Sequence, residues 1–217
     1  MRISHRHKFV YIAIRKTGSV SIRQMLDKYS DVFGGGKYSF AYPGHLTARQ
    51  LVSEFEKNGW DAWDDYYRFT VVRHPIARLF SCYKYMLRWA QKPPSSNMTR
   101  KCAKFHIKCV NFVERNLSFN DAVLQGVLTG DFARPQVEYI LDHNKESLLN
   151  KIIKLENLRE ELAEVWNDIG LPLEDLDNIP HLNVSPSEYT WQELLSEEAI
   201  QKIKTWYAKD FEFLNYK

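Results

Sequence analysis

The chain has 217 residues and a formal net charge of +3, with 44% hydrophobic and 26% charged residues. These values are typical of a soluble globular protein with a sizeable core, and they exclude a disordered or low-complexity chain. We expect a single domain over residues 1–217 without a membrane span, because no apolar run approaches the roughly 18 residues that a span needs.

A strand and a helix are predicted at the start of the chain. The run KFVYIAI at residues 8–14 is aromatic, β-branched and almost entirely apolar, which favours a central strand of a parallel sheet. Apolar residues then recur at helical spacing as far as Tyr29, which predicts a helix from about Ser19. The polar turn RKTGS joins the two elements.

A glycine-rich connection begins at Gly34 and delivers His45 just before a second predicted helix, which Thr47 can cap. RFTVV at residues 68–72 is predicted to be a second buried strand. Pro75 suits the first position of the helix that comes next.

The alternation continues to the end of the chain. Polar residues dominate 91–101, and we expect a mobile lid or loop around 91–110. A third strand at 151–155 leads into a helix at about 157–169, and a last helix is predicted from 196 to 208. Together these elements predict an α/β fold, a P-loop-like three-layer sandwich whose central, mostly parallel sheet is flanked by helices. The loops after its strands meet at one edge, where such folds bind ligands.

One long segment contains basic but no acidic residues, and it lies between Asp65 and Glu114. We expect a positive field there, or simply a solvated basic face. The basic residues of the segment are Arg68, Arg73, Arg78, Lys84, Arg88, Lys92, Arg100, Lys101, Lys104 and Lys108.

The three cysteines contain no CxxC pair, so they indicate neither a zinc site nor a disulfide framework. Reduced thiols are the simplest interpretation. Cys102 and Cys109 could pair in an oxidising compartment.

The first polar turn has the chemistry of an anion site. A helix that begins near Ser19 has free N–H groups and a partial positive charge at its first turn. Gly18 lets a ligand approach the backbone, Thr17, Ser19 and Ser21 can donate hydroxyl hydrogen bonds, and Lys16 adds a positive charge. The turn lacks the G-x-x-x-x-G-K-[ST] pattern of nucleoside triphosphatases, which makes an ATP hydrolase less favoured.

A second anion site is predicted after the second strand. Arg73 ends that strand and Ser81 lies on the following helix, so both can bind one anion. Two such sites on neighbouring strand–helix units indicate a nucleotide with phosphates at both ends. Arg78, on the same helix, is expected to be structural.

With these elements the chain resembles the PAPS-dependent sulfotransferases, where PAPS is 3′-phosphoadenosine 5′-phosphosulfate. It is most similar to the carbohydrate (Golgi-type) branch, which includes heparan sulfate 2-O-sulfotransferase and the chondroitin sulfotransferases. The family's 5′-phosphosulfate loop resembles FVYIAIRKTGSVSI at 9–22, and its 3′-phosphate element resembles FTVVRHPIARLFSCYKYM at 69–86. Weaker matches are GHLTA at 44–48, KLENL at 154–158, HLNVS at 181–185 and the DFEFLNY ending. The family usually has Pro where this chain has Arg15.

The resemblance implies PAPS as donor, adenosine 3′,5′-bisphosphate as product and no required metal. It assigns Lys16 to the departing phosphate and makes His45 of GHLTA the catalytic base, with His74 and His181 as alternative bases. The donor contacts that it implies are Lys16, Thr17, Gly18, Ser19, Val20, Ser21, Arg73, Ser81 and Asn183. Asn183 and Ser185 close over the nucleotide, or else form a plain turn.

The implied acceptor carries a hydroxyl group and is a carbohydrate, such as an acidic glycan, or another small alcohol. Nucleic acid is not expected as a partner. We expect a cytoplasmic enzyme in a prokaryotic host, because a first strand by Lys8 leaves no room for a signal peptide, and a Golgi lumenal one only if an N-terminal anchor has been removed.

Two other functions stay open at this point. A P-loop-like nucleotide or nucleoside kinase would bind ATP with magnesium. A non-enzymatic polyanion-binding module would use the basic residues between 66 and 113, and its binding would be sensitive to salt.

Overall fold

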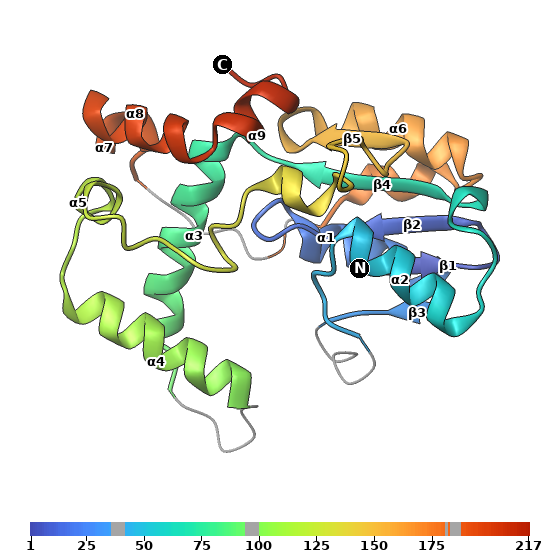
Figure 1. Cartoon of the computed structure of the whole chain (residues 1–217), viewed down its shortest axis with the longest axis horizontal. Coiled ribbons are helices and arrows are strands. Elements are labelled where there is room, and N and C mark those ends of the chain that lie inside the picture. The colour runs from blue at the N-terminus through green and yellow to red at the C-terminus, as the bar shows by residue number, and fades with distance from the viewer. Residues whose placement is uncertain (36–41, 94–99, 181, 183–187) are drawn as a thin grey trace. The chain divides into compact units, whose positions relative to one another are not determined.

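A five-stranded sheet forms the centre of the first part of the chain in the computed structural model (Figure 1). Its strands are β1 (Arg2–Ser4), β2 (Phe9–Ile12), β3 (Val32–Phe33), β4 (Tyr67–Val72) and β5 (Lys151–Lys154), and they lie in the order β3-β1-β2-β4-β5. β2, β4 and β5 are parallel to one another, whereas β1 is antiparallel to both of its neighbours. The mixed α/β fold with a mostly parallel sheet is thereby confirmed.

The structure describes residues 1–35, 42–93, 100–180, 182 and 188–217. These residues divide into two compact units, which we describe separately. The first unit comprises Met1–His74 and Pro135–Val184, and the second comprises Pro75–Arg134 and Ser185–Lys217. A single functional domain over the whole chain stays a prediction.

In the first unit, helices α1 (Ser19–Leu26) and α6 (Leu158–Asp168) share one core with the sheet. Side chains alternate along a strand, so every second residue of β2, β4 and β5 enters this core. The strand residues concerned include Phe9, Tyr11, Phe69, Val71 and Ile153. Each large apolar side chain buried in this way contributes about 1.5–3 kcal/mol to folding.

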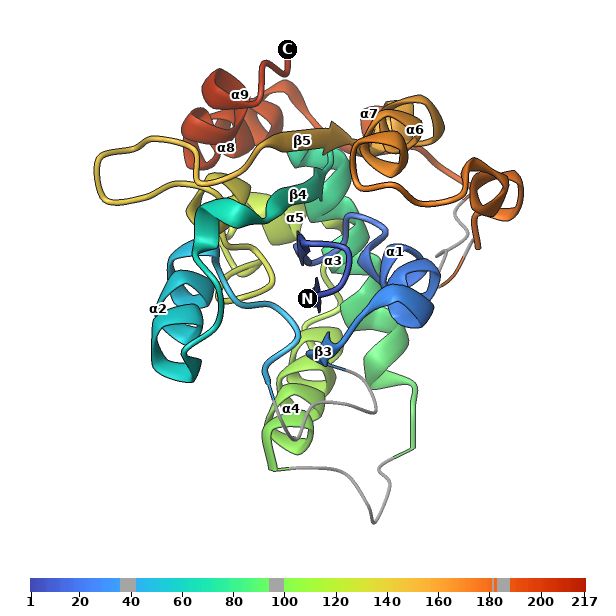
Figure 2. The same cartoon turned by 90° about the vertical axis from the view of Figure 1, so that its right-hand side faces the viewer.

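The opposite face of the sheet is also buried. Val10 and Ile12 of β2 are fully shielded from solvent, which explains why the sequence of this strand is apolar without interruption. Figure 2 shows α2 (Ala48–Asn58) on the other side of the sheet from α1. Thr47 caps α2 as predicted, since its hydroxyl accepts from the Gln50 N–H at 3.2 Å and its own N–H donates to the Gln50 side chain.

The second unit is helical. Its helices are α3 (Pro75–Ala90), α4 (Arg100–Glu114), α5 (Phe119–Leu124), α7 (Trp191–Leu194), α8 (Glu197–Trp206) and α9 (Ala208–Phe213). Residues from α3, α4, α5 and α8 form one apolar core. Pro75 begins α3, as predicted for a residue whose fixed φ suits the first helical position.

The segment expected as a lid or loop around 91–110 is helical and not an irregular loop from Arg100 onward, and its role as a lid stays a prediction. Cys109 and Phe112 on one side of α4 are buried in the helical core, so an apolar stripe stabilises the helix despite its many basic residues. Residues 94–99 lie outside the described part of the chain.

Short 3₁₀ turns connect several of these elements. They are η1 (Asp27–Tyr29), η3 (Trp63–Asp65), η4 (Gln136–Tyr139), η5 (Leu155–Asn157) and η6 (Leu173–Asn178). In the ranges that the structure covers, no helix has the length and apolarity needed to cross a membrane. Cys82, Cys102 and Cys109 are not in disulfides, so the pairing of Cys102 with Cys109 is not formed.

Candidate functional site

The predicted anion-binding turns follow two strands that are direct neighbours. β2 and β4 are parallel, with Ile12 opposite Thr70, and the Thr70 hydroxyl donates to the Ile12 carbonyl at 2.6 Å. Neighbouring strands lie about 4.8 Å apart, so the chain leaves both strands at the same edge of the sheet. Lys16 and Arg73 are therefore brought to one edge of the first unit.

The turn after β2 has a backbone that exposes N–H groups. Lys16 and Gly18 have left-handed φ values of 66° and 75°, and Ser19 begins α1. A left-handed residue followed by a right-handed one directs successive N–H groups to the same side, and the helix adds its partial positive charge. A left-handed conformation costs a residue such as Lys16 about 1–2 kcal/mol, so this turn is held in a shape that its sequence does not prefer.

The hydroxyl groups of the turn have partners within the protein. The Thr17 hydroxyl is buried and donates to the Ile14 carbonyl at 3.1 Å, which closes the turn onto the end of β2. A Thr17 contact with an anion would therefore have to come from its backbone N–H. The Ser21 hydroxyl accepts a hydrogen bond from the Leu182 N–H at 3.2 Å. Ser19 is buried and Val20 is exposed.

His45 lies against the end of the same strand. Its Nδ1 is 2.7 Å from the Ala13 carbonyl oxygen, and Ala13 directly follows the last residue of β2. A carbonyl oxygen only accepts hydrogen bonds, so Nδ1 carries the hydrogen. In the neutral ring the lone pair is then on Nε2, which is the arrangement that a general base requires.

The surroundings of His45 keep its ring neutral. Burial lowers its pKa most, and the positive charge of Arg15 lowers it further, to about 3. The hydrogen bond to Ala13 acts in the opposite direction and is too weak to offset them. At neutral pH the imidazole is unprotonated and able to accept a proton.

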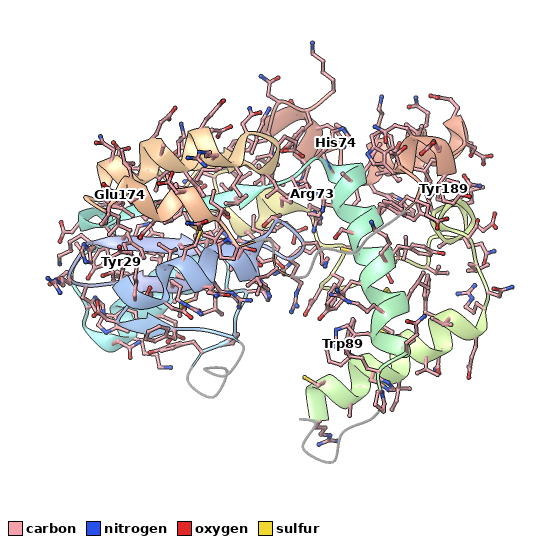
Figure 3. All side chains as sticks on the ribbon, turned by 180° about the vertical axis from the view of Figure 1, so that it is seen from behind. Tyr29, Arg73, His74, Trp89, Glu174 and Tyr189 are labelled. Carbon is pink, nitrogen blue, oxygen red and sulfur yellow. The ribbon has the colours of Figure 1, made fainter. Side chains whose placement is uncertain are left out.

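Arg73 is positioned by a residue that sequence reasoning missed. The fully buried Gln136 side chain accepts from the Arg73 N–H at 2.9 Å and donates to the Arg73 carbonyl at 2.8 Å. The Glu156 carboxylate accepts from the His74 N–H at 2.8 Å. Figure 3 shows Arg73 and His74 where β4 ends. The side chains of Gln136 and Glu156 bond the backbone just beyond β4. They thereby fix the backbone from which the Arg73 side chain extends.

The KLENL segment that contains Glu156 is itself close to the phosphate turn. A Cβ atom added to Gly18 would lie 3.1 Å from Leu155 Cδ1, in the 3₁₀ turn that follows β5. The sequence pointed to the segment of Glu156, because KLENL is one of the weaker matches to the family. Nothing local in the sequence pointed to Gln136.

Other predicted residues are not brought to this edge by the described structure of the first unit. Ser81 is on α3 in the second unit, so its role stays a prediction. Asn183, His181 and Ser185 lie outside the described residues. His74 is partly buried, its backbone N–H donates to Glu156, and its role as an alternative base stays a prediction.

Two arginines of the basic segment have partners within the protein. Arg78 is buried, donates to the carbonyls of Phe132 and Arg134, and lies over the Tyr207 ring, which confirms its structural role. Arg68 is bound to Asp64 at the surface. In the described part of the chain, no group of His, Cys, Asp and Glu side chains is arranged to hold a metal ion.

A family model described as the sulfotransferase family matches residues 1–217, which is the full sequence. Searches of curated proteins and of solved structures returned no significant match. The site geometry therefore has to be interpreted from this chain's own residues and from the family as a whole.

Proposed function

Because the chain belongs to the sulfotransferase family, we propose that it moves a sulfuryl group from PAPS to a hydroxyl group of a carbohydrate or another small alcohol. Membership of the family makes it an enzyme of sulfuryl transfer. The choice of donor, the acceptor class and the histidine base are the parts that we propose.

The turn at residues 16–21 is the proposed site for the phosphosulfate end of PAPS. Support comes from the left-handed Gly18, which allows close approach, and from the N–H groups at the start of α1. When bound, PAPS supplies an activated sulfuryl group and an anionic leaving group. Lys16 would stabilise the negative charge that develops on the departing phosphate.

The proposed ligand for the 3′-phosphate is Arg73. Its backbone is held on both sides by Gln136, so its guanidinium starts from a fixed point next to the phosphate turn. A guanidinium offers a fork of donors that matches a phosphate group. Ser81 and Asn183 are proposed as further donor ligands from the sequence alone.

The single observation that carries the proposal is the state of His45. Its Nδ1–H is committed to Ala13, its ring is neutral, and its Nε2 lone pair is the free end of a side chain fixed beside the phosphate turn. In the transfer, Nε2 accepts the proton of the acceptor hydroxyl while the oxygen of that hydroxyl forms the new bond to sulfur. The old sulfur–oxygen bond breaks, and its electron pair leaves with the phosphate.

The low pKa of His45 also has a consequence for the order of events. A base with a pKa of about 3 is a weak proton acceptor, and cations around it contribute to that value. A bound donor brings negative charge next to Arg15, which offsets this cation and raises the pKa of His45. The base would therefore become stronger once PAPS is in place.

We propose an acceptor of the carbohydrate class because the chain's motifs resemble that branch of the family. The excess of basic residues between Asp65 and Glu114 supports an acidic glycan among the candidate acceptors. The same chemistry would suit a small alcohol that carries a carboxylate or phosphate.

The test is transfer from radiolabelled PAPS to a panel of glycans and small alcohols, together with thermal denaturation in the presence of adenosine 3′,5′-bisphosphate. We expect a raised melting temperature with the bisphosphate, and loss of transfer in Lys16→Ala and His45→Asn. Lys57→Ala and His143→Asn, at exposed positions, serve as matched controls with full activity.

Three results would contradict the proposal. The first is an unchanged melting temperature at saturating bisphosphate. The second is magnesium-dependent ATP binding in its place, which would favour a kinase. The third is salt-sensitive heparin binding without turnover that survives both site substitutions, which would favour a polyanion-binding module.

A further inference from the structure

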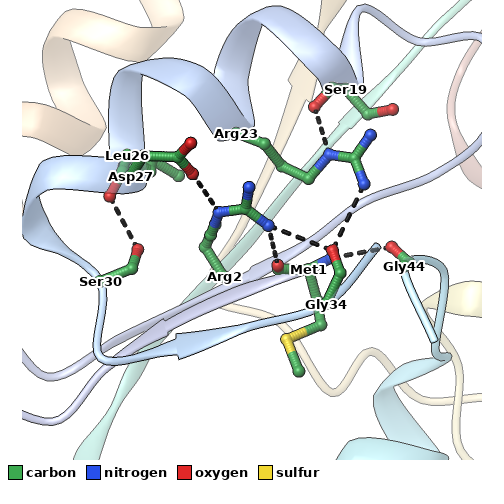
Figure 4. Close-up of polar contacts among 9 residues, drawn as sticks. All are labelled: Met1, Arg2, Ser19, Arg23, Leu26, Asp27, Ser30, Gly34 and Gly44. Carbon is green, nitrogen blue, oxygen red and sulfur yellow. Dashed lines mark hydrogen bonds and ion pairs between the residues drawn. The ribbon is translucent and has the colours of Figure 1, made fainter. Parts of the chain in front are cut away.

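Arg23 connects the phosphate turn to the segment that carries His45. Its side chain runs back along α1 toward the N-terminal end of the helix, where Nε donates to the Ser19 carbonyl at 3.1 Å (Figure 4). Its Nη1 donates to the Gly34 carbonyl at 3.4 Å, in the segment that follows β3. One guanidinium therefore holds the first turn of α1 and the glycine-rich connection at the same time.

Two glycines, Gly35 and Gly44, lie against this guanidinium, and neither position has room for a side chain. A Cβ atom added to Gly35, which has a φ of 83°, would lie 2.6 Å from Arg23 Nη1 and 2.7 Å from the Gly44 Cα. A Cβ atom added to Gly44 would lie 3.1 Å from Arg23 Nη1. The backbones of Gly35 and Gly44 thus pack directly on each other and on Arg23, and the residue after Gly44 is His45.

A second guanidinium fixes the same point from the other side. Arg2 Nη1 donates to the Gly34 carbonyl at 3.1 Å, and Arg2 Nε pairs with Asp27 at 2.5 Å (Figure 4). The Gly34 carbonyl consequently accepts charge-assisted hydrogen bonds from both arginines. Arg23 adds to this point the hydrogen bond to Ser19, which reaches the phosphate turn.

We propose that Arg23 is a positioning residue for His45, because it joins the first turn of α1 to the Gly35–Gly44 pair and so sets where the base stands relative to the phosphate turn. This inference rests on the proposed function, in which His45 accepts a proton from the acceptor. Arg23 itself touches neither reacting group in this role.

The charge of Arg23 gives the role a second readout. The side chains whose positive charge lowers the pKa of His45 are Arg15, from the turn after β2, and Arg23, from α1. Removing one of them raises the pKa, so the acid limb of the rate profile moves to higher pH. A charged residue remote from His45 would not move this limb, so the shift reports that Arg23 lies close to the base.

The experiment compares kcat, the KM for PAPS and the pH profile in wild type, Arg23→Lys and Arg23→Gln. A lysine keeps the charge but lacks the planar fork that places Nε on one carbonyl and Nη1 on the other, so we expect kcat to fall about tenfold or more without a shifted acid limb. Arg23→Gln should lose a similar factor and also show the shift. The KM for PAPS should change by less than about threefold in either variant, because Arg23 acts on the base and not on the donor.

Two glycine-to-alanine variants test the same link without changing any charge. Gly35→Ala should lower kcat as the arginine variants do, because its new methyl group pushes Arg23 and Gly44 apart. Gly170→Ala is the matched control, since Gly170 has a similar left-handed φ of 66° with nothing within 4 Å of an added Cβ. It should keep the wild-type kcat.

The outcomes separate the inference from the proposed function. Failure of the wild type to transfer sulfuryl groups, or full activity of His45→Asn, would overturn the proposed function. Folded Arg23 variants with wild-type kcat and pH profile, or with a raised KM for PAPS alone, would overturn the inference. Nitrogen NMR of the His45 ring measures its tautomer and so tests the positioning without any turnover. We expect a protonated Nδ1 in wild type and a mixture of tautomers in Arg23→Lys. The same tautomer in both proteins would overturn the inference as well.

Discussion

The state of His45 can be tested through protein stability, independently of any activity. Burial and the charge of Arg15 lower its pKa to about 3, whereas a histidine in an unfolded chain titrates near about 6.5. Between these two pH values the unfolded state binds more protons than the folded state. The free energy of unfolding therefore falls as the pH drops below about 6.5, and it continues to fall until about pH 3.

The magnitude follows from the same two pKa values. A pH of about 5 lies about 1.5 units below the pKa of the unfolded histidine, which is therefore mostly protonated, while folded His45 is still neutral. This difference lowers the free energy of unfolding by about 2 kcal/mol. His45→Asn removes this titration, and its side-chain amide can still donate to the Ala13 carbonyl that now accepts from Nδ1.

Urea denaturation at about pH 7.5 and about pH 5 measures the effect in both proteins. All other titrating groups are shared, so the difference between the two pH-induced losses isolates His45. We expect wild type to lose about 2 kcal/mol more than His45→Asn. Equal losses in the two proteins would refute a buried, neutral His45, and with it the reasoning on its lone pair.

The remaining predictions concern three other positions. Gln136→Glu should lower the free energy of unfolding by about 1–3 kcal/mol and weaken binding of adenosine 3′,5′-bisphosphate in calorimetry, because a carboxylate cannot donate to the Arg73 carbonyl; unchanged binding would contradict the role of this clamp. Gly18→Ala should raise the KM for PAPS well beyond the effect of Gly170→Ala, which carries a similar backbone penalty of about 1–2 kcal/mol at an open position. Arg78→Lys should destabilise the protein by about 1.5–3 kcal/mol in urea without changing the KM for PAPS, and a changed KM would argue against a purely structural arginine.

Several parts of the site could be predicted because their signal is local. The β2 strand is a continuous apolar run, since both faces of the sheet are covered, and the turn that follows it is marked by Gly18 and its hydroxyl neighbours. Thr47 and Pro75 mark helix starts through properties of single residues. Burial, capping and backbone freedom act within a few residues of the chain, so a short window of sequence contains them.

The two short strands β1 and β3 and the supports of the site were not visible in this way. β1 and β3 are too short for a period-2 pattern to stand out, and they exist because each pairs with a strand elsewhere in the sheet. Gln136 is one polar residue at the start of a short 3₁₀ turn, and only the fold brings it to Arg73, 63 positions away in the sequence.

The sequence by itself determined which chemical groups the protein has and where its main strands and helices begin, because these depend on neighbouring residues. The tertiary structure alone decided that the Nδ1 hydrogen of His45 is held by Ala13, that its ring is neutral beside Arg15, and that Arg23 spans from Ser19 to Gly34. Hydrogen bonds and charge interactions act over a few ångströms in space, whatever the separation along the chain, so only the folded arrangement specifies them.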